Sequence, residues 1–362
     1  MNRSTLAGAV LLLLSFAGLW VDARMFLAAW LSAWWWCLGL VLGALVNLWM
    51  HRLTGGAWGV VLRPVVALLV RRLPWLLLLF IPVAAGLSRL YPWAADPNGA
   101  WTTGIARPAF LHAWLSPAFF FARLAVYALV WCWLARGVTA LSSGRAARAL
   151  LAHALVTSLA SVDLLMSLMP GWYSTAFGLV TMSAQALGGA ALAILFLVRH
   201  APAVAAAHEH GKPPVWRDLG NLLMMWCMTW AYIAFMQFLI VWAENLPREI
   251  AWYLPRVQTG WWWVAVALVL GQLALPLVAL LFRSVKDQPA RLAWVAAGLL
   301  AATALDTVWM VVPSVAPHSW QGWWLLPMCF AGMGLLAFGA LPRELRGLER
   351  GHAARETAHA GA

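Results

Sequence analysis

Long apolar stretches follow one another along almost the whole chain, separated by shorter polar connections. A helix needs about 20 predominantly apolar residues to cross the roughly 30 Å hydrocarbon core of a bilayer. Ten stretches approach or exceed this length, so the pattern predicts an all-α integral membrane protein of about ten transmembrane helices. The predicted spans are 4–20, 26–50, 74–90, 118–137, 149–169, 175–199, 218–243, 260–283, 291–311 and 320–341.

The composition supports this prediction. Hydrophobic residues make up 64% of the 362 positions and charged residues only 10%, whereas ordinary soluble domains are about a quarter charged. A soluble core could not bury so many apolar side chains. Many of the 27 tryptophans stand beside turn-forming residues, as an aromatic belt at the membrane interface requires, although Trp34, Trp35 and Trp36 fall inside a predicted span.

Basic residues are distributed unevenly between the connections. If the N-terminus is cytoplasmic, eighteen of the 24 Lys and Arg residues fall on cytoplasmic segments and five on outer segments, with Arg123 inside a span. Cytoplasmic segments of membrane proteins carry such an excess. We therefore expect both termini in the cytoplasm, and the net charge of +12 follows from topology rather than from nucleic-acid binding.

Two aspartates occupy similar positions in the fifth and ninth predicted spans. VDLLMSLMP places Asp163 seven residues before Pro170, and LDTVWMVVP places Asp306 seven residues before Pro313. The repeated spacing favours an internal duplication in which two four-helix bundles are flanked by peripheral helices. The expected units are a peripheral helix at 1–25, bundles at 26–170 and 171–315, and a peripheral helix with a cytoplasmic tail at 316–362.

Polar side chains inside the predicted spans are the candidate functional residues, because a charge at the centre of a membrane helix costs about 2.5 to 3.5 kcal/mol. Five of them are expected at similar depth near the outer ends of their helices: Arg123, Asp163, Gln237, Glu244 and Asp306. Pairing of Arg123 with an aspartate could hold two helices together. The same cluster could instead handle protons or bind the headgroup of a ligand.

A second polar feature lies on the inner half of the fifth span. His153, Thr157 and Ser161 recur every four residues and therefore share one face of the helix. They could form a polar track from the cytoplasm toward Asp163. Alternatively, the hydroxyls could bond to backbone carbonyls while His153 marks the end of the helix.

The sequence lacks motifs for bound metals, haem or hydrolysis. The four cysteines stand singly, and only His153 among the nine histidines lies inside a span, so neither a metal site nor a bis-histidine haem is predicted. The AHEHG stretch at 207–211 is interpreted as a solvated loop. No Walker, GxSxG or HExxH motif occurs.

Four stretches together resemble a known family: LTGGAWG at 53–59, LYPWA at 90–94, SVDLLMSLMPGWYSTAFG at 161–178 and the tryptophan-rich stretch at 218–254. In this order they are similar to the membrane subunits of alternative complex III, a quinol:cytochrome c oxidoreductase, within the NrfD-like, polysulfide-reductase-type family of ten-helix proteins. The ActF-type subunit is a closer match than its ActC-type paralogue. The similarity extends from about residue 38 to residue 315.

The resemblance implies a multi-pass subunit of a respiratory complex in the inner membrane of a bacterium. The expected partners are a paralogous NrfD-like membrane subunit, a multihaem cytochrome c and iron–sulfur subunits on the periplasmic side, with a terminal oxidase as a further candidate. Haem and iron–sulfur centres are expected only in those partners. For this chain the resemblance implies a periplasmic-side site for quinone or quinol, or a proton channel.

Matching by position assigns Asp163 and Asp306 to two aspartates of the family pattern. The residues that match its WYST turn are Trp172, Ser174 and Thr175. The pattern usually reads MSLEPHW, whereas this chain has Met169 in place of the glutamate and Gly171 in place of the histidine. Because both ionisable groups are missing from the outer turn, quinol oxidation by this chain alone is disfavoured.

The leading hypothesis is a subunit without redox centres that contributes a proton pathway, supports a quinone-binding region, or both. Asp163 and Asp306 would load and release protons, and Arg123 would bias the pKa values of these two carboxyl groups. Two alternatives remain, a proton-coupled secondary transporter that uses the same carboxylates and an assembly scaffold. Transporters of this kind usually have helices broken near the midplane, whereas Pro170 and Pro313 stand at predicted helix ends.

Overall fold

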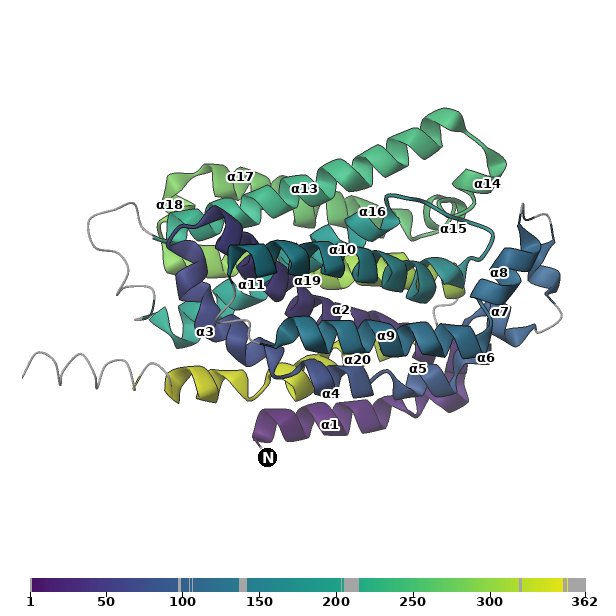
Figure 1. Ribbon diagram of the computed structural model, residues 1–362, viewed down its shortest axis with the longest axis horizontal. Coiled ribbons are helices and arrows are strands. Elements are labelled where there is room, and N and C mark those ends of the chain that lie inside the picture. The colour runs from purple at the N-terminus through teal and green to yellow at the C-terminus, as the bar shows by residue number, and fades with distance from the viewer. Residues whose placement is uncertain are drawn as a thin grey trace, which may run out of the picture.

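The chain folds into a bundle of helices, with no strand among the residues that the computed structural model describes (Figure 1). These are residues 2–96, 99–103, 105, 107–136, 142–202, 204, 215–318, 321–347 and 350. The predicted all-α membrane class is confirmed. Residues 348, 349 and 351–362 of the predicted tail and the stretch 207–211 lie outside the described residues.

The helices follow the chain in two series. The first contains α1 (Arg3–Ser15), α2 (Gly18–Thr54), α3 (Trp58–Val70), α4 (Leu73–Leu78), α5 (Ile81–Ala85), α6 (Leu87–Leu90), α7 (Pro92–Ala95), η1 (Ala100–Thr102), α8 (Pro108–Trp114), α9 (Pro117–Ala135), α10 (Ser143–Leu164) and η2 (Met166–Leu168). The second contains α11 (Phe177–His200), α13 (Val215–Glu244), α14 (Pro247–Ile250), α15 (Leu254–Val257), α16 (Trp262–Leu268), η3 (Val269–Ala274), α17 (Leu275–Leu281), α18 (Arg283–Lys286), α19 (Pro289–Val315) and α20 (Leu325–Phe338).

Eight of the described helices are long and apolar enough to cross a membrane, so the protein is a multi-pass membrane protein. They are Gly18–Thr54, Pro117–Ala135, Ser143–Leu168, Phe177–His200, Val215–Glu244, Trp262–Leu281, Pro289–Val315 and Leu325–Gly347. Each covers most of one predicted span, and Gly18–Thr54 also includes the end of the predicted span 4–20. The segments Trp58–Val70 and Leu73–Ala85 would together form a ninth crossing with a bend of 42°. At about 1.5 Å per residue, the 13 residues of α1 are shorter than the hydrocarbon core.

A bend at Asp22 separates the first two predicted spans. The backbone of Asp22 leaves the helical region (φ −154°, ψ 94°) inside α2. Its side-chain Oδ1 accepts a hydrogen bond of 2.9 Å from the backbone N–H of Met25. A carboxylate that accepts from the third N–H of a helix acts as its N-cap. Asp22 therefore begins the long central part of α2, while α1 packs against α20 on the outside of the bundle (Figure 1).

Helix α2 lies at the centre of the bundle. In its membrane-spanning window 94% of the residues are buried, as expected for a helix that is apolar on every side. It packs closely against α11 at Gly43 and Gly189, where a Cβ atom on Gly43 would lie 1.8 Å from the backbone oxygen of Gln185. Small residues permit such close contact between membrane helices. α2 and α11 belong to different predicted bundles, and their close contact does not test whether the chain divides at residue 170. That division stays a prediction.

Two tryptophans of α2 form hydrogen bonds with the region in which the predicted span 74–90 is broken into the short helices α4, α5 and α6. Trp30 and Trp34, one turn apart, donate their indole N–H groups to the backbone oxygens of Leu79 and Leu76, each at 2.7 Å. A broken helix in an apolar environment needs such substitute donors, because water is not there to bond its carbonyl groups. These contacts give tryptophans inside a span a structural role away from the interfacial belt.

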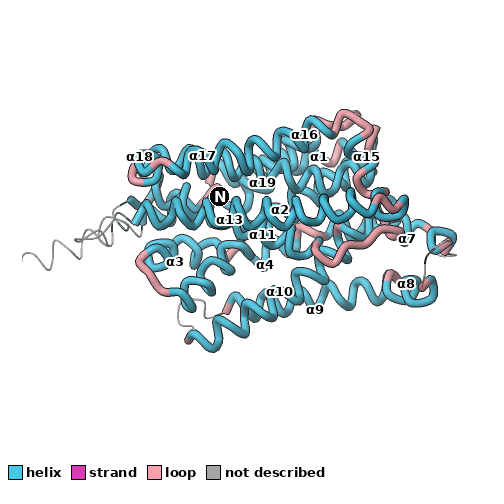
Figure 2. Tube along the Cα trace, turned by 90° about the horizontal axis from the view of Figure 1, so that it is seen from above, coloured by secondary structure: helices cyan, strands magenta, loops and turns pink. Residues whose placement is uncertain are grey.

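The outward faces of the outer helices carry large apolar side chains. Leu129 of α9, Leu155 of α10 and Leu275 of α17 are between 66% and 70% exposed. Soluble proteins rarely expose apolar surface on this scale, whereas contact with lipid requires it. The connections gather at two ends of the bundle, with α18 and α3 at one end and α7, α8, α14 and α15 at the other (Figures 1 and 2). We call the second the loop end, formed by residues 86–96, 99–103, 105, 107–116, 165–176 and 245–261.

Candidate functional site

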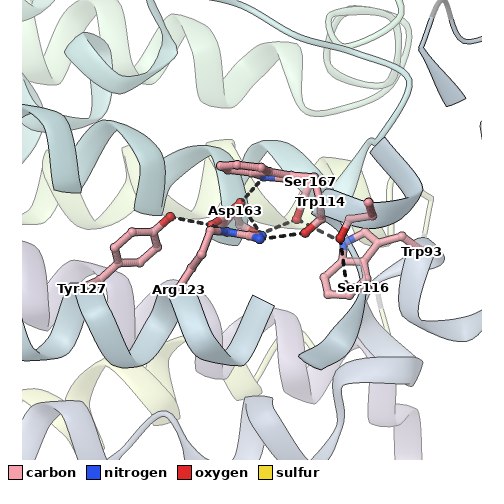
Figure 3. A network of polar contacts seen from close by, with 8 residues as sticks. Trp93, Trp114, Ser116, Arg123, Tyr127, Asp163 and Ser167 are labelled. Atoms are coloured by element: carbon pink, nitrogen blue, oxygen red, sulfur yellow. Dashed lines mark hydrogen bonds and ion pairs between the residues drawn. The ribbon is translucent and has the colours of Figure 1, made fainter. Parts of the chain in front are cut away.

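Asp163 and Arg123 form a buried ion pair near the loop end (Figure 3). Arg123 of α9 donates from Nε to Oδ2 of Asp163 at 2.7 Å and from a terminal nitrogen to Oδ1 at 3.1 Å. Asp163 is completely buried and Arg123 is only 7% exposed. The geometry is the two-point contact that a guanidinium makes with a carboxylate. Among the candidates from the sequence, it is Asp163 rather than Asp306 that contacts Arg123.

Further donors complete the surroundings of this pair. The hydroxyl of Tyr127 donates to Oδ2 of Asp163 at 2.7 Å, and the indole of Trp114 donates to Oδ1 at 2.9 Å. Arg123 also donates to the backbone oxygen of Trp114 at 2.8 Å and stacks over the rings of Trp114 and Phe119 at 4.1 and 4.5 Å. The two carboxylate oxygens of Asp163 therefore accept four hydrogen bonds in total. A buried pair with its remaining polar atoms satisfied holds α9 and α10 together.

The helix that carries Asp163 ends immediately after it. α10 stops at Leu164, whose backbone oxygen accepts a hydrogen bond of 2.8 Å from the hydroxyl of Tyr91. Ser167 donates to the backbone oxygen of Asp163 and accepts a bond of 3.2 Å from the indole of Trp93. Tyr91 and Trp93 both belong to the LYPWA stretch. Side chains from that stretch thus satisfy carbonyl groups that the helix leaves unpaired at its end.

A second, open site lies on the other side of the bundle. A cavity of about 520 Å³ is bounded by α13, α16, η3, α19 and the residues around α15. Its walls are mostly aromatic and aliphatic and include Trp230, Phe235, Trp252 and Trp309. Asp306 of α19 lies in the same wall and is 4% exposed. Ligand cavities typically have this volume and this combination of apolar walls with few polar groups.

Three polar side chains form one corner of this cavity region. Gln237 of α13 accepts a hydrogen bond of 2.9 Å from the hydroxyl of Ser174 and contacts the hydroxyl of Tyr253 at 3.3 Å through its amide nitrogen. Gln237 and Tyr253 line the cavity. Burial raises the pKa of the Tyr253 phenol, so that it remains a neutral hydrogen-bonding group. The corner can therefore donate to and accept from a polar ligand without carrying charge.

Asp306 differs from Asp163 in having no salt bridge among the described residues. The indole of Trp230 approaches its carboxylate but does not close a hydrogen bond of normal geometry. Asp306 also lines a small second cavity of about 20 Å³, together with Gln185 and Thr303. Both amide atoms of Gln185 are buried without a protein partner. A polar cavity of this size holds about one water molecule, which could bond to both side chains.

Arg256 is a buried cation beside the large cavity. It is 0% exposed, stacks over the ring of Trp252 at 3.4 Å and donates to the backbone oxygens of Trp309 and Met310 at 3.1 and 2.9 Å. Pro313 has no N–H and cannot donate to the oxygen of Trp309, four residues earlier, as other helical residues do. Arg256 thus supplies the hydrogen bond that Pro313 removes from α19.

The remaining predicted residues lie apart from both sites. His153 is 2% exposed, and its Nδ1 lies 3.2 Å from the hydroxyl of Thr157. Ser161 donates to the backbone oxygen of Ser158, so the bonds that the structure gives do not extend the track to Asp163. Glu244 is exposed at the end of α13, away from the cavity that Gln237 lines. The expected gathering of one cation and three acids therefore separates into different places.

The turn with the sequence WYST connects the first site with the cavity. Trp172 is buried, stacks on Trp252 at 5.2 Å and donates to the backbone oxygen of Glu249 at 2.8 Å. Ser174 contacts Gln237, whereas Thr175 is exposed. Met169 is partly buried, and a Cβ atom at Gly171 would meet open space, so a larger residue there would not clash.

Several buried polar residues in or beside the cavities were not among the sequence candidates. Arg256 stands next to Pro255 in an apolar stretch and was counted only as an outer basic residue. Gln185 and Gln272 are polar residues inside predicted spans, the signal that selected Gln237. Gln272 is completely buried in η3, a π-helical segment, and both of its amide atoms lack a protein partner. Such segments occur often at functional sites.

Comparison with known proteins does not assign the chain. No protein-family model matches it, and no curated protein matches its sequence. Among the described residues, no group of three or more His, Cys, Asp or Glu side chains could hold a metal ion. The fold therefore defines a class, the multi-pass α-helical membrane proteins. The two sites are the observations from which a more particular function can be inferred.

Proposed function

We propose that the protein is a membrane subunit of a respiratory quinol-oxidising complex, in which it supports a quinone-binding region and provides part of a proton pathway. One observation carries the proposal: Asp306, which has no salt bridge among the described residues, lines both the 520 Å³ apolar cavity and the small polar cavity. A carboxylate in this position can contact a ligand on one side and water on the other. Ionisable residues inside membrane helices commonly mark such pathways.

The large cavity fits a quinone ring in size and chemistry. Trp230, Phe235 and Trp309 provide flat apolar surfaces, and the volume of about 520 Å³ lies within the usual range for small-molecule sites. Tyr253 and Gln237 are the groups that could orient a ring oxygen by hydrogen bonds. Oxidation of a bound quinol to quinone would pass its electrons to the haem or iron–sulfur centres of the partner subunits and release its protons one at a time toward Asp306. The carboxylate of Asp306 would accept a proton as a general base, which must lie within hydrogen-bond distance of the hydroxyl that gives up the proton.

The small cavity provides a next step for that proton. Gln185 has unsatisfied donor and acceptor atoms, so a water molecule between Gln185 and Asp306 would be fixed in orientation. Thr303 and Thr307 line the same cavity and can bond to the same water. Asp163 takes no part in this route, because its carboxylate already accepts two hydrogen bonds from Arg123 and one each from Tyr127 and Trp114. In this proposal its role is to fix α9 against α10.

The wider setting of this proposal comes from the resemblance described above. It includes ten spans in two four-helix bundles, both termini in the cytoplasm, and a bacterial inner membrane. It also includes a paralogous membrane subunit, a multihaem cytochrome c, iron–sulfur subunits and a terminal oxidase as partners. The loop end would face the periplasm, since the excess of basic residues lies on connections at the opposite end. Haem and iron–sulfur centres would lie in the partners.

The proposal is tested by Asp306→Asn in the assembled complex. We expect quinol:cytochrome c turnover to fall by about 100-fold, the usual contribution of a positioned general base, while quinone binding measured by ligand titration is retained. Glu244→Gln, the same change at an exposed acid of α13, is the matched control. Unchanged turnover and unchanged proton-to-electron stoichiometry in Asp306→Asn would refute the proposed route.

A proton-coupled secondary transporter remains the second candidate, because one observation favours it. The span Trp262–Leu281 departs from α-helical geometry at the π-helical segment η3 without ending there, and irregular helices within a span are typical of transporters. In an internal duplication, however, the corresponding span would be α9, which runs unbroken from Pro117 to Ala135. Substrate uptake by the purified chain in liposomes would support the transporter. An assembly scaffold would instead keep normal turnover in all charge-neutral variants and lose the complex only on deletion.

A further inference from the structure

A third cavity, of about 570 Å³, lies at the loop end next to the Arg123–Asp163 pair. We call it the arginine cavity. Its walls come from α8, from η2 and from the turn that follows η2, and they include Phe110, Leu111, Trp114 and Trp172. The proposed function does not use it. The cavity is separate from the Asp306 cavity, with which it shares no lining residue.

Two cations line this cavity and no acid does. Arg107 and Arg248 are both exposed, and neither forms a salt bridge among the described residues. Among the described residues, Arg248 donates only from Nε, to the backbone oxygen of Gly171 at 3.1 Å, and its guanidinium lies 5.8 Å from the ring of Tyr173. Its terminal nitrogens therefore remain available. The two guanidinium groups attract an anion. The apolar walls of the cavity favour a ligand that also has an apolar part.

The surroundings show where the apolar part of such a ligand would lie. Phe110 is 58% exposed and lines the cavity, and Phe119 of α9 and Leu159 of α10 are 46% and 42% exposed on the neighbouring helices. Phe119 and Leu159 lie on outward, apolar faces of the membrane-spanning helices α9 and α10, whereas Phe110 belongs to the short helix α8. A ligand held by Arg107 and Arg248 could thus extend from the end of the bundle along its lipid-facing surface.

We propose that the arginine cavity binds an anionic phospholipid, with the phosphate between Arg107 and Arg248 and an acyl chain along Phe110 and the outer face of α9. A quinol fits this site less well than the Asp306 cavity, because it is uncharged and the described residues that line the arginine cavity include no carboxylate to accept its protons. A free phosphate would leave the aromatic walls in water. The phospholipid satisfies both the charge and the apolar surface.

The experiment uses the full-length protein purified in detergent and titrated with phosphatidylglycerol or with phosphatidylcholine of the same chain length. Binding is followed by native mass spectrometry. Each arginine near a lipid headgroup contributes about 1 kcal/mol, so Arg107→Gln combined with Arg248→Gln is expected to weaken phosphatidylglycerol binding roughly 30-fold. Arg107→Lys with Arg248→Lys should retain most of the binding. Arg89→Gln changes an exposed arginine of the loop end outside the cavity, and it should have no effect.

Several outcomes would overturn this assignment. One is equal binding of the two lipids, and another is an equal loss in Arg89→Gln. If inorganic phosphate displaces phosphatidylglycerol at millimolar concentration, the ligand is free phosphate instead. If the glutamine variants lose partner subunits while no anionic lipid is bound to the wild type, the cavity is a protein interface. Turnover of the Asp306→Asn complex is a separate measurement, so failure of one proposal leaves the other standing.

Discussion

The two intramembrane aspartates show how the same short pattern can lead to different sites. Asp163 and Asp306 each stand seven residues before a proline, yet α10 ends one residue after Asp163, whereas α19 continues for nine residues beyond Asp306. Asp163 accepts four hydrogen bonds, two of them from Arg123. Asp306 has no salt bridge among the described residues and faces two cavities. One aspartate is fully used inside the protein and the other can still serve a ligand.

The two buried arginines make the same comparison from the cationic side. Arg123 and Arg256 each donate to the backbone oxygen of a preceding tryptophan and stack on its ring, Trp114 in one case and Trp252 in the other. Arg123 then finds a carboxylate, while Arg256 finds the carbonyl oxygens of α19. In the first region both charges are neutralised together. In the second region the cation is satisfied by the backbone, which leaves Asp306 without an ionic partner.

The largest expected effect separates the two aspartates by stability. Asp163→Asn leaves the buried guanidinium of Arg123 without its counter-charge, and breaking such a pair costs about 3 to 5 kcal/mol. Asp306→Asn removes a buried carboxylate that has no ion pair, so it should leave stability unchanged or raise it. Thermal and denaturant unfolding in detergent compares the two variants directly.

A double variant serves as the control for this prediction. Arg123→Met combined with Asp163→Leu removes both charges and should recover most of the stability that Asp163→Asn loses. If Asp306→Asn destabilised the protein as strongly as Asp163→Asn, Asp306 would also be a structural residue, and the contrast between the two regions would fail.

The sequence could predict the class and the positions of the spans, because every helix that crosses the bilayer must be long and apolar enough to span the hydrocarbon core. Each of the eight spanning helices overlaps a predicted run. The prediction was less complete at 74–90, where Trp30 and Trp34 bond to carbonyl groups of a broken helix. Those bonds depend on helix packing, and hydropathy carries no information about them. For the same reason the pattern at 4–20 did not predict that α1 would span only Arg3–Ser15.

The candidate site was predictable only in part. Depth along a helix follows from residue number, so the sequence could propose Arg123, Asp163 and Asp306 as neighbours in depth. Which aspartate meets Arg123 depends on the rotation of α9, α10 and α19 around their axes, which one sequence does not show. Arg256 was missed because all but one of its hydrogen-bond partners, the hydroxyl of Ser314, are backbone oxygens. Such partners have no sequence signal except Pro313, the residue that frees one of them.

A smaller effect is expected where Arg256 replaces a backbone donor. Arg256→Met should cost about 1.5 to 3 kcal/mol, the usual loss when hydrogen bonds from a charged group are removed. In the Pro313→Ala background, the new backbone N–H can bond to Trp309, so the same substitution should cost about 1 kcal/mol less. Unfolding of the four proteins in this cycle gives the coupling. An equal cost in both backgrounds would show that Arg256 does not compensate for Pro313.

The smallest effect is expected at the exposed counterpart of the buried pairs. At the end of the bundle opposite the loop end, Arg217 donates to the carboxylate of Asp287 at 2.8 and 2.6 Å, and both side chains are more than a quarter exposed. The hydrogen bonds from Arg217 hold the pKa of the Asp287 carboxyl below its usual range. The pair therefore stabilises the fold fully above the ordinary carboxyl pKa of about 4, and its contribution disappears as the pH falls through the lowered value.

Water and salt screen this pair, so Asp287→Asn should lower the melting temperature only slightly at pH 7, and 1 M salt should remove most of the difference. Below the lowered pKa the variant and the wild type should melt together. The buried Arg123–Asp163 pair should show no comparable dependence on salt, because solvent does not reach it. If 1 M salt instead reduced the cost of Asp163→Asn as much as that of Asp287→Asn, Asp163 would be in contact with solvent, and its role would move from fixing α9 against α10 toward the proton route assigned to Asp306.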